Sequence, residues 1–212
     1  MVDYIFKIRI RFSKLGDIRF ISHHDLMRVF ERAVRRACIP IVMSRGFNPH
    51  PKLSIPLALS VGIVGKDEIW EMELLKPMPL EVLVKSLSQH LPKEIHILSM
   101  ESVPQGTKSL IRDITYEIVF KNPNLLKTLK VNEFLQQASI IINRSKNGCQ
   151  KPFNIRPSIQ EITVEANSLI LSIRTTSEGL SRPEEVLRAL CVNGKKELFE
   201  ITRTKINLSS PA

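Results

Sequence analysis

The N-terminal segment of this chain alternates between two sets of side chains, and this pattern constrains the fold more than any other feature. The apolar set points to one side of the backbone: Tyr4, Phe6, Ile8, Ile10 and Phe12. The largely basic set points to the other side: Ile5, Lys7, Arg9 and Arg11. A period of two predicts a half-buried β-strand whose outer face is basic.

The next segment has the pattern of an amphipathic helix. Ser22 and Asp25 form a variant capping box, which predicts a helix beginning there and running to about Cys38. Pro40 ends it. At about 100° per residue, the apolar side chains fall on one stripe: Leu26, Phe30, Ala33 and Ala37, flanked by Val29 and Val34. The opposite stripe is basic: Arg28, Arg32, Arg35 and Arg36. We therefore expect one buried face and one positive face.

Similar patterns give the order of the remaining elements. In the first half we expect strands over residues 39–43, 53–64 and 68–75, a helix over 80–91 and a strand over 94–102. Pro104 and Gly106 then interrupt both patterns, which indicates a boundary. Beyond it we expect strands over 110–120, 139–143, 153–164, 168–175 and 196–206, helices over 125–138 and 181–192, and a polar insertion over 144–151.

This order predicts the α+β class, with two tandem ferredoxin-like (βαββαβ-type) units that have antiparallel sheets and helices packed on one face. The first unit covers residues 1–104 and carries the arginine helix, and the second covers residues 105–212. A chain of 212 residues suits two small domains of about 100 residues each. No sequence repeat is obvious, so the duplication is inferred from element order alone.

The positive charge is concentrated rather than spread. Residues 7–52 hold 11 basic and 3 acidic residues, so they carry +8 of the chain's net charge of +10. A hydrophobic content of 43% and a charged content of 25% are typical of a folded protein. A solvated helix face would carry mixed signs with i,i+4 pairs, whereas here like charges recur at that spacing. The clustering favours an anionic partner, and RNA in particular.

The loop after the arginine helix has the composition of a presented, polar segment. Residues 44–52 read SRGFNPHPK, and Pro49 and Pro51 bias Asn48 and His50 toward extended geometry. Arg156 also precedes a proline in a strand context, and we consider it for a phosphate contact. The candidate RNA-binding residues are Arg28, Arg32, Arg35, Arg36, Arg45, Phe47, Asn48, His50, Lys52 and Arg156.

Two histidines are candidates for acid–base chemistry. His23 lies in the first turn of the arginine helix, and His50 lies between two prolines. If both reach one cleft, they can serve as general base and acid on an RNA 2′-hydroxyl and its leaving oxygen. The alternative is that His23 hydrogen-bonds the loop backbone and braces it. His90 at a helix end and His96 in a strand need only structural roles.

Cysteine and histidine spacing argue against several site types. Cys38, Cys149 and Cys191 lie far apart, so no structural zinc site, disulfide framework or iron–sulfur cluster is expected on this chain, and a reducing cytoplasm fits best. The longest uncharged apolar-rich run, residues 53–65, contains Pro56 and falls short of a membrane span. We expect no metal and no membrane partner.

Four segments together resemble the bacterial radical-SAM-associated family of unknown function. They are residues 12–26 (FSKLGDIRFISHHDL), 30–37 (FERAVRRA), 44–54 (SRGFNPHPKLS) and, more weakly, 154–157 (NIRP). His24 and Arg45 depart from the family pattern, so His24 is not a catalytic candidate. The resemblance implies an accessory to radical SAM chemistry, with the iron–sulfur cluster and SAM held by the partner. The arginine helix and its loop are also similar to tandem ferredoxin-like CRISPR repeat-processing endoribonucleases.

These observations lead to three hypotheses. The first is an RNA-binding accessory module without catalytic activity, which presents structured RNA (tRNA or rRNA) to a radical SAM protein. The second is a metal-independent endoribonuclease that uses His23 and His50, with Lys52 or Arg45 stabilising charge on the phosphate. The third is a protein-docking scaffold whose basic face meets an acidic surface of the radical SAM subunit.

Overall fold

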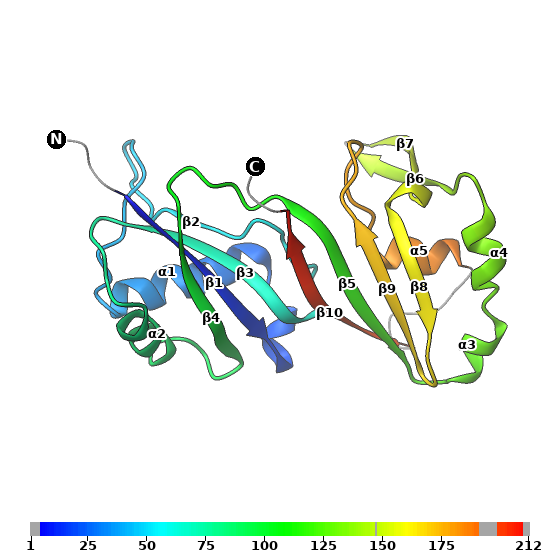
Figure 1. Cartoon of the computed structure of the whole chain (residues 1–212), viewed down its shortest axis with the longest axis horizontal. Coiled ribbons are helices and arrows are strands. Elements are labelled where there is room, and N and C mark those ends of the chain that lie inside the picture. The colour runs from blue at the N-terminus through cyan, green and yellow to red at the C-terminus, as the bar shows by residue number, and fades with distance from the viewer. Residues whose placement is uncertain (1–4, 147, 191–198, 210–212) are drawn as a thin grey trace. The chain divides into compact units, whose positions relative to one another are not determined.

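The protein has a mixed α+β structure in which the strand pairs with a defined register are antiparallel. The computed structural model describes residues 5–146, 148–190 and 199–209. Tyr4, Cys191, Val192 and residues 196–198 lie outside the described residues. The chain forms two units (Figure 1): unit 1 comprises Met1–Leu110 and Leu208–Ala212, and unit 2 comprises Ile111–Asn207.

Among its described residues, unit 1 contains one four-stranded antiparallel arrangement, two α-helices and a short 3-10 helix. Its elements are β1 (Phe6–Lys14), a short 3-10 helix (Gly16–Phe20), α1 (His23–Arg36), β2 (Leu53–Ser54), β3 (Val64–Leu74), α2 (Leu80–Ser88) and β4 (Ile95–Val103). The strands lie in the order β4-β1-β3-β2. The first strand in sequence is therefore central, and the last strand lies at one edge.

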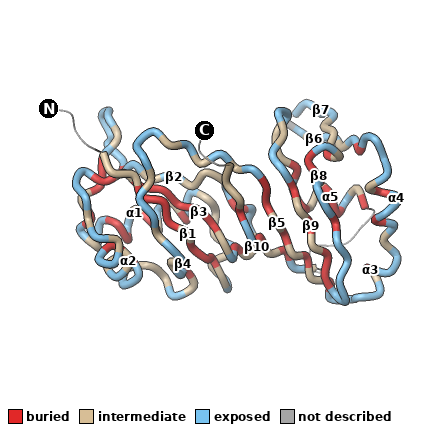
Figure 2. The backbone as a smooth tube through the Cα atoms, in the orientation of Figure 1, coloured by how far each residue is buried: buried red, intermediate tan, exposed pale blue. Residues whose placement is uncertain are grey.

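The core of unit 1 lies between this sheet and the helices, where the two sequence patterns meet. The buried set includes Ile8, Ile10 and Phe12 from β1, Leu26, Phe30, Ala33 and Val34 from α1, and Leu83 and Leu87 from α2. Phe30 stacks on Trp70 of β3 with ring centroids 4.1 Å apart, and Phe12 meets Phe30 edge-on at 5.1 Å. Such aromatic pairs add about 0.5–1.5 kcal/mol beyond their buried area. Figure 2 shows the buried positions gathered along β1 and β3.

Unit 2 repeats the use of a sheet with short helices and adds a hairpin. Its elements are β5 (Ile111–Phe120), α3 (Asn124–Thr128), α4 (Val131–Gln136), β6 (Ile141–Lys146), β7 (Cys149–Asn154), a 3-10 helix (Arg156–Ser158), β8 (Ile159–Val164), β9 (Ser168–Arg174), α5 (Pro183–Ala189) and β10 (Phe199–Leu208). The main strands lie in the order β10-β5-β9-β8, and β6 pairs with β7 as a separate hairpin.

Several expected elements differ from the structure. The strand expected over residues 39–43 is reduced to isolated bridges at Ile41 and Met43. The strand expected over 153–164 is divided between β7 and β8 by the 3-10 helix, so Arg156 does not lie in a strand. The strand expected over residues 53–64 is limited to β2. Pro56 has no backbone N–H to donate to a neighbouring strand, and Gly62 turns the chain with a φ of 90°.

The helix expected over 125–138 is broken at Leu129, which has an extended ψ of 123°. Val131 would lie about 140° from Leu126 on one continuous helix, so the break lets both be buried. The polar insertion is the β6–β7 hairpin.

Candidate nucleic-acid interface

Helix α1 is capped at both ends, which defines the backbone face from which its exposed side chains project. At the start, the Ser22 hydroxyl accepts from the Asp25 amide at 3.1 Å and donates to the Asp25 carboxylate at 2.7 Å. This is the cap that the sequence predicts. At the end, the Ile39 amide donates to the Val34 carbonyl at 3.2 Å and Cys38 has a φ of 51°, as in a Schellman turn.

The outward face of α1 carries the arginine stripe, which we define as Arg28, Arg32, Arg35 and Arg36, all exposed. Arg28 Nη1 lies 3.2 Å from Asp25 Oδ1, an exposed ion pair that is worth only about 0–1 kcal/mol. In the part of the chain that the structure describes, no hydrogen bond or ion pair engages the other three guanidinium groups. The stripe is therefore available to an anionic ligand.

The predicted presented loop is the end of a small hairpin, which we call the loop hairpin (residues 42–52). The Lys52 amide donates to the Val42 carbonyl at 2.8 Å, and the Ser44 amide donates to the His50 carbonyl at 2.7 Å. The His50 amide returns a bond to Ser44 Oγ at 2.9 Å. Val42 and Lys52 also bond the backbone of Glu73 in β3 at 2.8 and 3.2 Å. The hairpin is thus anchored to the sheet at its base.

Five residues form the tip of the loop hairpin: Arg45, Gly46, Phe47, Asn48 and Pro49, all exposed. Gly46 has a φ of 133°, which an L side chain rarely adopts, so glycine is required for this turn. Nothing lies within 4 Å of a Cβ built on Gly46. The tip therefore stands in solvent. In Figure 1 the loop hairpin, in light blue, projects upward from unit 1, above the ribbon of α1.

The two candidate catalytic histidines lie on different elements of unit 1. The pKa of His23 is lowered, first by burial and then by the nearby charges of His24 and Lys14. Its Nδ1 is buried and has no hydrogen-bond partner among the described residues, so the expected bond from this nitrogen to the loop is not formed there. His50 is exposed in the loop hairpin. The lowered pKa favours the neutral form of His23, which is the form that a general base requires.

His90 has the structural role expected for it. It follows the last turn of α2, and its Nδ1 lies 2.8 Å from the Ser86 carbonyl oxygen. His96 is exposed on β4. Within the described residues, no three His, Cys, Asp or Glu side chains gather closely enough to hold a metal ion. In those same residues, no helix is both long and apolar enough to cross a bilayer.

The basic outer face of β1 is neutralised by acidic side chains that the sequence reading did not pair with it. Lys7 Nζ lies 2.7 Å from Glu71 Oε2, and Arg9 Nε lies 3.1 Å from Glu71 Oε1. Ser109 Oγ also donates to Glu71, and Lys7 donates to the Thr107 carbonyl at 2.6 Å. We call these five residues the Glu71 cluster. Burial alone would raise the pKa of Glu71, but the bonds from Lys7, Ser109 and Arg9 outweigh it and lower that pKa.

Arg9 and Arg11 make further pairs on the same face. Arg9 Nη1 lies 3.1 Å from Glu101 Oε1 of β4, and Arg11 Nη1 lies 2.6 Å from Asp67 Oδ2 of β3. Lys7, Arg9 and Arg11 of β1 are therefore all engaged in ion pairs within unit 1. The alternation of Ile69 to Leu74 signals outward acidic positions, but only the register of β1 against β3, which pairs Arg9 with Glu71, shows which cation each one meets.

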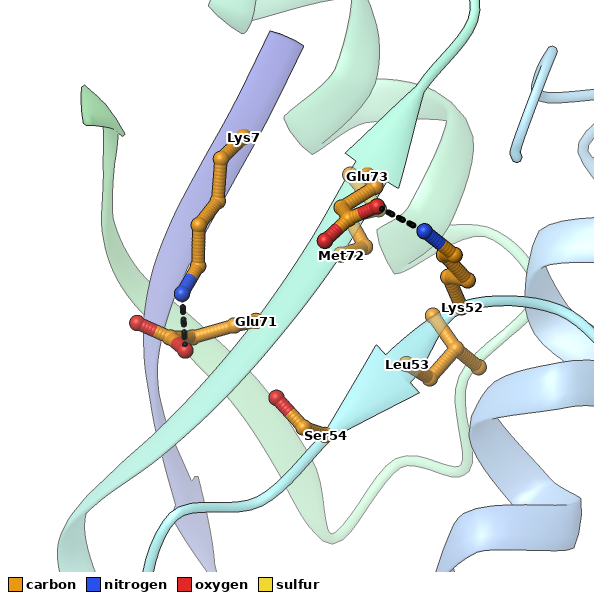
Figure 3. A pocket seen from close by; sticks show the side chains of 7 residues that line it. All are labelled: Lys7, Lys52, Leu53, Ser54, Glu71, Met72 and Glu73. Atoms are coloured by element: carbon orange, nitrogen blue, oxygen red, sulfur yellow. Dashed lines mark hydrogen bonds and ion pairs between the residues drawn. The ribbon is translucent and has the colours of Figure 1, made fainter. Parts of the chain in front are cut away.

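A hollow of about 250 Å³ opens beside this network (Figure 3). Its walls come from Lys7, Lys52, Leu53, Ser54, Glu71, Met72 and Glu73. Both lysines in the wall are paired, and Lys52 Nζ lies 2.9 Å from Glu73 Oε2. The pair is partly exposed, so it contributes only about 0–1 kcal/mol, and a phosphate can compete for this ammonium group. Lys52 is a weaker candidate than the stripe for this reason.

Arg156 lies in unit 2 and is held by backbone carbonyls. Its Nε donates to Leu135 at 3.0 Å and its Nη1 donates to Ile159 at 3.1 Å. The Asn154 side chain accepts from the Arg156 and Ile140 amides at 3.1 and 2.9 Å. The NIRP segment thus ties α4 to the start of β8. We leave Arg156 out of the proposed interface, because two of its donor groups are already used.

The chain belongs to a bacterial family that is described as "Uncharacterized protein conserved in bacteria (DUF2344)", whose model matches residues 7–188. The matched region includes the arginine stripe, the loop hairpin and the Glu71 cluster. A comparison with curated proteins gave no match. The family description names no ligand or activity.

Proposed function

We propose that this member of the family is an RNA-binding accessory module, which binds RNA through the arginine stripe and the loop hairpin and presents it to a radical SAM partner. The observation that carries the proposal is the stripe itself. Arg35 and Arg36 lie in the last turn of α1, where cations complement the helix dipole. Arg28 and Arg32, and Arg32 and Arg36, are nevertheless like charges at i,i+4 spacing, which disfavours the helix slightly. The other basic side chains of the same region, on β1, are already paired.

Arginine chemistry supports a polynucleotide as the ligand. A guanidinium group stays charged, binds phosphate oxygens through two parallel bonds and stacks on bases. Binding to a phosphate chain also releases counterions, so several arginines in a row give an additive contribution. The loop hairpin adds a polar and aromatic tip of the kind that reads shape or an unpaired base in structured RNA such as tRNA or rRNA.

The radical SAM partner is proposed from the sequence resemblance of residues 12–26, 30–37 and 44–54. In this proposal the iron–sulfur cluster and SAM belong to the partner, which performs the chemistry. The role of this chain is to bind and orient the RNA. A basic face can instead meet an acidic protein surface, and that alternative has a distinct outcome in the experiments below.

We also propose that each unit is ferredoxin-like. In unit 1 the strand order β4-β1-β3-β2, with helices after β1 and β3, supports this assignment. In unit 2 the order β10-β5-β9-β8, with helices after β5 and β9, supports it in the same way. The β6–β7 hairpin is then an insertion between the first helical segment and the second strand of that unit.

Binding of purified protein to fluorescently labelled tRNA at a fixed salt concentration tests the function. Arg32→Glu/Arg36→Glu should weaken binding by more than tenfold, because it replaces two phosphate ligands with two repelling charges. Lys127→Glu/Arg188→Glu is the matched control, since it changes the net charge equally at exposed helix positions of unit 2. The control should bind as the wild type does.

Two results would contradict the proposal. One is equal loss of affinity in both double variants, which would indicate only net charge. The other is a radical SAM protein retained by this chain after ribonuclease treatment, with no RNA binding by the pure protein. That second result would support the docking scaffold instead.

A further inference from the structure

The aromatic ring at the tip of the loop hairpin has no packing role in unit 1. Phe47 has a relative exposure of 107%, whereas the next most exposed large apolar side chain among the described residues, Leu110, reaches 62%. The neighbouring Gly46 has nothing within 4 Å of its Cβ position. The ring therefore stands away from the rest of the described chain.

The ring is nevertheless held on a defined support. Two hydrogen bonds between Ser44 and His50 close the tip, and the backbone hydrogen bonds to Glu73 join the base of the hairpin to β3. Pro49 and Pro51 fix their own φ angles, and the turn at Gly46 fixes the direction of the chain. A ligand that contacts the ring has less loop disorder to remove, which favours affinity.

The neighbours of the ring indicate what it can contact. Arg45, Asn48 and His50 are exposed close to it in the sequence, so cationic and hydrogen-bonding groups flank the ring. The other exposed large apolar side chain of the loop hairpin is Met43, which is 41% exposed where it pairs with Pro51, away from the tip. A protein or lipid anchor would need a wider apolar patch. An unpaired nucleotide offers the complementary set: a flat base for the ring, a phosphate for the cation, and a base edge for the amide of Asn48.

We infer that Phe47 is a base-stacking wedge, and that the RNA bound by this chain carries an unpaired nucleotide in a loop, bulge or single strand. The inference depends on the proposed RNA binding and narrows its substrate class. A continuous RNA duplex offers no base on which the Phe47 ring can stack. Its bases are already stacked on one another, and side chains cannot read its deep, narrow major groove. The arginine stripe would still bind such a duplex through phosphates alone.

The test uses the full chain and two RNAs with the same number of phosphates, a stem with an unpaired loop and a blunt duplex. Phe47→Leu keeps an apolar side chain but removes the ring, and Phe47→Trp keeps an aromatic face. Phe47→Leu should weaken binding to the loop RNA by about 5- to 150-fold, which is the range that base–aromatic stacking gives. Its affinity for the duplex should be unchanged, and Phe47→Trp should bind both RNAs as the wild type does.

The outcomes separate this inference from the function on which it depends. If Phe47→Leu binds the loop RNA as tightly as the wild type, or loses affinity for both RNAs equally, Phe47 does not stack on an unpaired base. The proposed RNA binding is not contradicted by either result. If the wild type binds neither RNA, the proposed function fails and the wedge fails with it. Circular dichroism of Phe47→Leu should match the wild type, since the ring contacts no core residue.

Discussion

Replacing Glu71 with glutamine should destabilise unit 1 strongly although the change is small in volume. The Glu71 side chain is only 5% exposed and accepts from Lys7, Arg9 and Ser109. Lys7 and Arg9 are themselves only 14% and 10% exposed. Glutamine removes the negative charge and leaves two nearly buried cations with less compensation. The network also holds residues 107–109 against the sheet, so the change reaches beyond one strand.

The expected loss follows from this burial. Removing one partner of a buried ion pair lowers the free energy of unfolding by about 3–5 kcal/mol. Because Lys7 is partly exposed, we expect Glu71→Gln to lose about 3 kcal/mol, the lower end of this range. For a chain of this length, that loss lowers the melting temperature by about 6–12 °C.

The loss should also depend on pH. Because the pKa of Glu71 is lowered in the folded state, its stabilisation is complete above the ordinary value of 4.5 and is lost as the pH falls through the folded pKa. The wild type and the variant should therefore converge in acid.

Thermal unfolding followed by circular dichroism at pH 7 and at a series of pH values below 4.5 measures this difference. The control is Glu101→Gln, which removes the other acidic partner of Arg9, but Glu101 is 60% exposed. Glu101→Gln should lower the free energy of unfolding by no more than about 1 kcal/mol. A Glu71→Gln loss equal to the control loss, or a difference that grows in acid, would refute the reasoning about the buried network.

Three further predictions concern the cap, the stripe and the histidines. Cys38→Gly should stabilise the chain by about 0.5–1 kcal/mol in urea unfolding, because glycine adopts the positive φ of 51° without strain; a destabilisation would contradict the Schellman assignment. Arg32→Ala/Arg36→Ala should lower the salt slope of RNA binding by about 1.4 in log–log units, and an unchanged slope would show that neither side chain contacts phosphate. RNA incubated with the protein in EDTA should stay intact. Cyclic-phosphate products that disappear in His50→Ala would establish the endoribonuclease instead.

Patterns with a single periodicity were sufficient to predict the core of unit 1. Alternation along β1 identified Ile8, Ile10 and Phe12 as buried, and the helical wheel identified the buried and exposed faces of α1. These predictions succeed because each depends on neighbours within one element. The Ser22 cap succeeds for the same reason, since its partner lies three residues away.

Contacts between distant strands were beyond such patterns. Arg9 and Glu71 are 62 residues apart, and only the β1–β3 register brings them together. The basic face of β1 therefore contributed to the predicted positive region although its charges are paired. Arg156 shows the same difficulty, because the carbonyls of Leu135 and Ile159 that hold it depend on the packing of unit 2.

The sequence predicted that residues 44–52 form an exposed polar loop, but not that this loop is a hydrogen-bonded hairpin. Pro49, Pro51 and Gly46 indicate a presented turn from sequence alone. The hydrogen bonds between Ser44 and His50, and those that join the hairpin to Glu73, all involve backbone groups. Because every residue type except proline carries these groups, the sequence does not predict which of them pair. The isolation of Phe47 follows from that form, so its exposure could not be inferred from the sequence.

Mapping of ultraviolet crosslinks between the full chain and the RNA that co-purifies with it tests the central claim most directly. We expect crosslinked peptides from residues 28–36 and 45–50, with Phe47 among the modified positions, and few from unit 2. Crosslinks confined to residues 111–190, with none on α1 or the loop hairpin, would contradict it.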